Sequence, residues 1–115
     1  MAAHIKKELG SATITSNTTT NGQGVVLHCH AQELVAVSTV SSRTDGTYTT
    51  SIEHSPDGNT WFTLATGAAQ SANGAVVITV ASSVSVFQHI RASVVSTSVT
   101  SGADLEIELF HGVQR

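Results

Sequence analysis

The sequence is poor in the features on which disulfide-rich domains, membrane proteins and secreted proteins depend. A single cysteine, Cys29, leaves no internal disulfide framework available. No apolar run approaches the roughly 18–20 residues that a membrane helix needs. The first residues lack the apolar stretch of a signal peptide. We therefore expect a protein that is made in the cytoplasm, needs no oxidising compartment and does not bind a membrane.

Charged residues are also scarce. They make up 11% of the chain, and the formal net charge is −3. The basic residues are scattered, so no stripe of positive charge that would follow a phosphate backbone is present. We therefore expect no nucleic acid among the partners. The basic residues are Lys6, Lys7, Arg43, Arg91 and Arg115.

What the chain does have is a composition typical of β-sheets. Its 115 residues fit one domain. The apolar residues are mainly Val, Ala, Ile and Leu, accompanied by many Ser and Thr, and β-branched residues of this kind favour strands. Disordered chains are usually highly charged and poor in β-branched residues, which is the reverse of this composition.

Turn signals such as Asp45-Gly46 and Asn73-Gly74 divide the chain into short β-rich runs. Their spacing predicts an all-β fold, an antiparallel β-sandwich of jelly-roll or Ig-like type, with about seven to eight short strands and little or no helix. Asn21-Gly22 and Ser101-Gly102 are further turn signals. The expected strands are Ala12–Ser16, Val25–His30, Leu34–Ser41, Thr47–Ser55, Thr60–Ala65, Ala75–Ala81, Val84–Val95 (with a bulge or bend near Phe87) and Asp104–Phe110.

Two of these runs alternate clearly enough to assign faces. In 47–55, one face carries Tyr48, Thr50, Ile52 and His54. In 104–110, apolar side chains should face the core and acidic ones should face outward. We expect the acidic row to mark an edge strand, where charge discourages pairing between sheets. The apolar set is Leu105, Ile107 and Leu109, and the acidic set is Asp104, Glu106 and Glu108.

The first residues differ from the rest of the chain. Residues 1–11 hold both lysines and precede any strand signal. Two interpretations remain open: a short lead-in to the first strand, or an arm that reaches onto a neighbouring subunit. In either case a single β-sandwich domain is expected over residues 12–115, and the polar stretch Thr15–Gly24 is expected to be a loop or an arm.

His28-Cys29-His30 is the one candidate metal site. In a strand, His28 and His30 share a face, as in many β-sheet metal sites. With Gly22 upstream, the tripeptide also matches part of the first motif of cupins, but no second motif follows. We therefore expect no metal and no cofactor, with His28 and His30 facing solvent or a subunit contact and Cys29 packing as a small core residue.

No other pattern assembles a catalytic site. No serine lies in a G-x-S-x-G elbow. Gly22-Gln23-Gly24 lacks the third glycine and the following helix of a phosphate loop. We therefore expect that the protein is not an enzyme.

The most informative stretch is a hairpin pattern in which Ser55-Pro56-Asp57-Gly58 leads to Trp61 between two strands. Asp57 and Gly58 should form the turn, with the Asp57 carboxylate capping backbone amides. Trp61 should fold onto the base of the hairpin and be buried there, since aromatic residues are scarce in this chain.

This hairpin, followed by Phe87-Gln88-His89-Ile90-Arg91, resembles small β-sandwich proteins of tailed bacteriophage virions. The resemblance covers roughly Thr47 to Phe110 and implies a structural virion protein. The expected role is a capsid decoration (cement) protein that binds the major capsid protein on the outer capsid surface. A homotrimer is expected, because such proteins are often trimeric and a small domain with few aromatics is marginally stable alone.

Three alternatives remain. The first is another virion component, such as a head fibre, neck or tail-tip module. The second is a carbohydrate-binding sandwich for host attachment, which requires an exposed aromatic platform from among Trp61, Tyr48, Phe62, Phe87 and Phe110. The third is a metal-dependent barrel of cupin type, which requires a bound metal.

Overall fold

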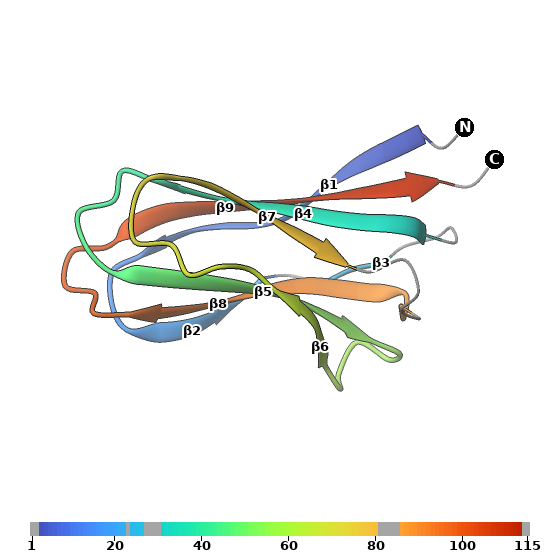
Figure 1. Cartoon of the computed structure of the whole chain (residues 1–115). Coiled ribbons are helices and arrows are strands. Elements are labelled where there is room, and N and C mark those ends of the chain that lie inside the picture. The colour runs from blue at the N-terminus through green and yellow to red at the C-terminus, as the bar shows by residue number, and fades with distance from the viewer. Residues whose placement is uncertain (1–2, 23, 27–30, 81–85, 114–115) are drawn as a thin grey trace.

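A computed structural model describes residues 3–22, 24–26, 31–80 and 86–113. Two antiparallel sheets pack face to face, and the described residues contain no helix (Figure 1). The all-β sandwich predicted from the sequence is therefore confirmed. The strands are β1 (Ala3–Ile14), β2 (Thr18–Asn21), β3 (Val25–Val26), β4 (Ala31–Ser41), β5 (Thr47–Ser55), β6 (Phe62–Thr66), β7 (Gly74–Val80), β8 (His89–Thr97) and β9 (Ala103–Val113).

The strand order is that of a jelly roll. One sheet has the order β1-β9-β4-β7 and the other β2-β8-β5-β6, with β3 also pairing with β8. β2 and β3 pair with successive parts of β8, so together they form one interrupted edge. Apart from the β2–β3 and β5–β6 connections, each connection crosses from one sheet to the other. This arrangement is a double-sheet jelly roll rather than an immunoglobulin sandwich.

The core lies between the inner faces of the two sheets. The face predicted for β5 is confirmed, because Tyr48, Thr50, Ile52 and His54 are all buried. Burial of the Thr50 hydroxyl is tolerated because it forms a 2.8 Å hydrogen bond with the Ser38 hydroxyl of the opposite sheet. The apolar face predicted for β9 is also buried, and it consists of Leu105, Ile107 and Leu109.

The acidic row was correctly predicted to face outward, but its strand is not at an edge. Asp104 and Glu106 are exposed, whereas β9 lies between β1 and β4. The outer face of an antiparallel sheet is open to water, so these carboxylates are solvated even on an inner strand. A row of acidic residues on the outer face therefore does not indicate whether its strand lies at the edge of the sheet or inside it.

The start of the first strand was also predicted wrongly. β1 begins at Ala3 and pairs with β9 from Ala3 opposite Val113 to Ile14 opposite Ala103. Residues 3–11 are thus most of the first strand. An edge position tolerates the charged residues of this segment, which is why they gave no strand signal. The stretch 15–24 likewise contains β2, at Thr18–Asn21, rather than being wholly a loop.

The expected strand Val84–Val95 begins later, at His89, and Phe87 lies just outside it. Residues 84 and 85 lie outside the described part of the chain.

One carboxylate organises the loops at the end of the sandwich opposite the β5–β6 hairpin. The Asp45 carboxylate accepts hydrogen bonds from the Thr100 hydroxyl and from the backbone N–H groups of Thr100, Ser101 and Gly102. These bonds, that from the Thr100 hydroxyl foremost, lower the pKa of Asp45 to about 2. The β4–β5 loop is thereby attached to the β8–β9 loop.

Candidate interaction site

The β5–β6 hairpin projects beyond the lower layer of the sandwich (Figure 1). Asp57 closes its turn: one carboxylate oxygen accepts from the backbone N–H of Asn59 at 2.8 Å and of Thr60 at 2.9 Å. The Ser55 hydroxyl donates to the same oxygen at 2.9 Å. The bonds from Thr60 and Asn59, then that from Ser55, lower the pKa of Asp57 to about 2. The turn is therefore built from side-chain acceptors.

The backbone conformation at position 58 of this turn favours glycine. Its φ of +82° lies in the left-handed region, which glycine adopts without steric cost. Its N–H donates to the Ser55 hydroxyl at 2.9 Å. Both turn residues singled out from the sequence thus have definite local roles.

Trp61 lies on the outer face of the sheet rather than in the core. The Arg91 guanidinium stands 4.4 Å from the centroid of its ring, within the range of a cation–π contact. Arg91 is also paired with Glu53, with 2.7 Å between Nε and Oε1. Trp61 remains partly exposed, in contrast to the expected burial, because the outer face covers it with Arg91 instead of a second sheet. A free aromatic platform is therefore not present at Trp61.

Three rings gather where β5 ends and β6 begins. The His54 ring lies 4.8 Å from the Phe87 ring and 6.3 Å from the Phe62 ring, measured between centroids. His54 is only 8% exposed, whereas Phe62 is 50% exposed and Phe87 45%. The cluster thus has a buried polar base and two aromatic side chains that face solvent.

His54 holds this cluster together through one defined hydrogen bond. Its Nδ1 accepts from the backbone N–H of Phe87 at 3.0 Å, which ties the segment before β8 to β5. Burial lowers the pKa of His54 below the ordinary value of 6.5, so the neutral ring is favoured. A neutral Nδ1 is what this acceptor role requires.

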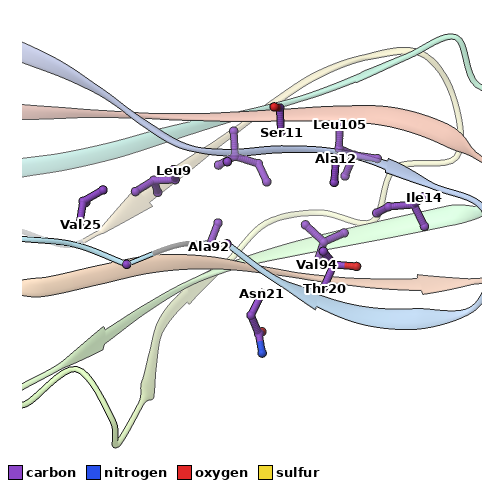
Figure 2. A pocket seen from close by; sticks show the side chains of 14 residues that line it. Leu9, Ser11, Ala12, Ile14, Thr20, Asn21, Val25, Ala92, Val94 and Leu105 are labelled. Atoms are coloured by element: carbon purple, nitrogen blue, oxygen red, sulfur yellow. The ribbon is translucent and has the colours of Figure 1, made fainter.

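A cavity of about 660 Å³ lies between the sheets, beside the edges formed by β1 and by β2 with β3. Figure 2 shows side chains from β1, including Leu9 and Ile14, opposite Ala92 and Val94 of β8. Asn21, one of the few polar residues bordering the cavity, points away from it. The lining of the cavity is mixed, with apolar side chains beside the hydroxyls of Ser11 and Thr20. The residues that line it include no titratable side chain that could exchange a proton with a ligand.

The metal candidates cannot be placed. His28, Cys29 and His30 lie outside the described residues. Among the residues that are described, no group of three or more His, Cys, Asp and Glu side chains could hold a metal ion. No described segment forms a helix long and apolar enough to cross a membrane.

The sequence named Phe62 and Phe87 only among five aromatic residues that could supply an exposed platform, and it did not bring these two together. The signal for Phe62 was the hairpin itself: the ring follows Trp61 and pairs with the end of β5, opposite His54. Phe87 gave no such signal, because it precedes β8 and its position depends on the hydrogen bond to His54.

Comparison with known proteins gives no match by sequence, whereas several solved structures match. No family model and no curated protein matches the chain. The PBSX exported protein XepA superposes over 96% of the chain with a TM-score of 0.70 and 15% identity. The two share a fold. The chain spans 38% of the XepA chain.

A second solved structure is that of Bacillus endospore appendages, described as a novel family of disulfide-linked pili. It aligns over 99% of this chain and 92% of its own, with 11% identity and a TM-score of 0.40, too low to establish a shared fold.

Proposed function

We propose that this chain is a structural protein of a phage particle that works by binding other proteins. The observation that carries the proposal is the fold shared with XepA, an exported protein of the phage PBSX, over nearly the whole chain. The jelly roll is an architecture used in viral capsid domains. The cavity between the sheets has no titratable side chain in its lining, which fits a binding role better than a catalytic one.

Within that class, the role we propose is capsid decoration. A decoration protein on the outer capsid surface contacts several subunits of the major capsid protein at once, so its attachment gains from avidity. A homotrimer would multiply such contacts threefold. A surface with few charges favours this role, because little charge has to be desolvated on docking.

The surface that fits this binding best is the aromatic end formed by His54, Phe62 and Phe87. Half-exposed phenylalanines are unusual in a chain that has only three of them. Exposed apolar groups that cluster in this way mark protein contacts, and aromatic residues there carry much of the binding energy. We assign this end to the contact with the shell.

The experiment is to measure copy number and attachment on purified particles. Hundreds of copies per particle support capsid decoration, whereas a dozen or fewer support a neck or tail module. Phe62→Ala and Phe87→Ala should each reduce the number of copies retained after washing, while Val95→Ala, at a valine 46% exposed on another surface, should not. Absence from particles, with binding to a glycan surface instead, would contradict the proposal and favour the carbohydrate-binding alternative.

A further inference from the structure

β7 lies at one edge of its four-stranded sheet. It pairs with β4 along its whole length, from Gly74 opposite Val40 to Val80 opposite Leu34. Among the described residues, no strand pairs with its other side. Alternate N–H and C=O groups of an edge strand point away from its neighbour and can accept a further strand.

The sequence of β7 contains none of the usual protection against such pairing. The strand Gly74–Val80 carries no charged residue and no proline. Ala75, Val77 and Thr79 are exposed on its outer face, and Val77 is 60% exposed, more than any other large hydrophobic residue described. Exposed edge strands of this kind pair readily with other strands.

The other edges of the sandwich differ from β7. β1 contains Lys6, Lys7 and Glu8, and its pairing is interrupted by a register shift between Glu8 and Gly10. The edge formed by β2 and β3 is broken between Asn21 and Val25. β6 has five residues and a register shift opposite it in β5. β7 is thus the regular, uncharged edge.

The uncharged surface extends beyond β7 onto β4. On the outer face, β4 places Val35, Val37 and Thr39 opposite the exposed residues of β7. The acidic row begins only on the next strand, with Glu106 opposite Thr39. A second strand added to β7 would therefore meet no charge on the two nearest strands over this length.

We propose that β7 pairs antiparallel with β7 of a second copy of this chain, so that two four-stranded sheets join into one across a two-fold axis. Pairing centred on Val77 places that residue opposite its own copy, Val76 opposite Ile78 and Ala75 opposite Thr79. Each pair is uncharged and consists of residues that are accommodated in β-strands. A two-fold contact of this kind uses the same surface on both subunits. Self-pairing at this edge brings no like charges together, although each chain has a net charge of −3.

This inference rests on β7 alone and holds wherever the protein acts. It assigns a two-fold contact, distinct from the three-fold assembly of the proposed decoration protein. The two can therefore fail separately: loss of the β7 contact should leave attachment through the aromatic end intact.

The first test compares two valine variants by sedimentation velocity over a range of concentrations. The wild-type protein should show a concentration-dependent dimer. Val77→Lys places two like charges opposite each other and should weaken the dimer at least about tenfold. Val95→Lys is the matched control: Val95 is 46% exposed on β8, an inner strand of the other sheet, and its substitution should leave the dimer unchanged. Circular dichroism confirms that both variants are folded.

The second test reports on register. In a Cys29→Ser background, Val77→Cys should form an intermolecular disulfide under mild oxidation. Directly opposite residues have Cβ atoms from about 4.5 Å apart, which a small shift of the strands brings within the roughly 3.5–4.5 Å that a disulfide spans. Val95→Cys in the same background should remain largely reduced. A wild-type monomer at all concentrations, a dimer insensitive to Val77→Lys, or a trimer without the Val77→Cys disulfide would each overturn the proposal.

Discussion

The carbonyl oxygen of Leu9 lies against the Cα of Gly22, so that a Cβ built on Gly22 would come within 2.4 Å of it. Leu9 falls at the register shift in the pairing of β1 with β9, and its side chain is buried. The Gly22 N–H donates to the carbonyl of Ala92 at 2.8 Å. The edges of the two sheets are therefore joined at this point, beside the cavity between them.

Gly22→Ala should destabilise the protein by about 1–3 kcal/mol, because the added methyl group meets backbone that cannot move aside without breaking strand pairing. Chemical denaturation followed by circular dichroism measures the change. Asn21→Ala, at an exposed residue that points away from the cavity, is the control and should stay within about 0.5 kcal/mol of wild type. Equal stability of Gly22→Ala and wild type would show that the edges separate freely.

Deletion of residues 1–11 should unfold or aggregate the protein. It removes most of β1, exposes the edge of β9 and takes away the buried side chain of Leu9. A lead-in or an arm would instead be dispensable for folding. Circular dichroism and solubility of the truncated chain decide between these, and a soluble, cooperatively melting truncation would contradict the strand assignment.

Stability should fall as the pH drops below about 6.5, through His54. Its pKa is lowered in the folded state by burial, so the unfolded chain binds the proton more readily, and acidification favours unfolding. The contribution is complete above the unfolded pKa of about 6.5 and is lost as the pH falls toward the lower folded pKa. The variant His54→Gln keeps a polar side chain but does not titrate. Its melting temperature should therefore change less between pH 7 and pH 5 than that of the wild type. If the melting temperature of the variant changed with pH as steeply as that of the wild type, groups other than His54 would be responsible for the acid sensitivity.

Asp45 and Asp57 should govern a second loss of stability at lower pH. Both carboxyls have a pKa of about 2 instead of the ordinary 3.8. Their contribution is therefore present above about 3.8 and is lost as the pH falls through about 2. Asp45→Asn and Asp57→Asn should each lower the melting temperature at pH 7, and the double variant should lose most of the change between pH 4 and pH 2. The prediction would be contradicted if the melting temperatures of the wild type and the double variant fell by the same amount between pH 4 and pH 2.

The sequence by itself determined the class of the fold, the approximate place of most strands and the faces of two of them, β5 and β9. β5 was predicted with its observed bounds, Thr47–Ser55, because alternation of polar and apolar residues between two glycine-containing turns is a local signal. The buried face of β9 followed from the same alternation, and Asp57 and Gly58 were placed in a turn because their backbone preferences are intrinsic to the residues.

Only the tertiary structure decided which strands are neighbours and which lie at the edges. Turn signals mark where the chain changes direction but do not show whether the next strand joins the same sheet, and in this jelly roll most connections cross to the opposite sheet. Asn21-Gly22 looked like a hairpin turn, yet Gly22 is required there because β1 leaves no room for a side chain. The aromatic end and the edge position of β7 likewise arise from contacts between distant segments. Local sequence does not encode such contacts individually, because they are selected by the packing of the whole core.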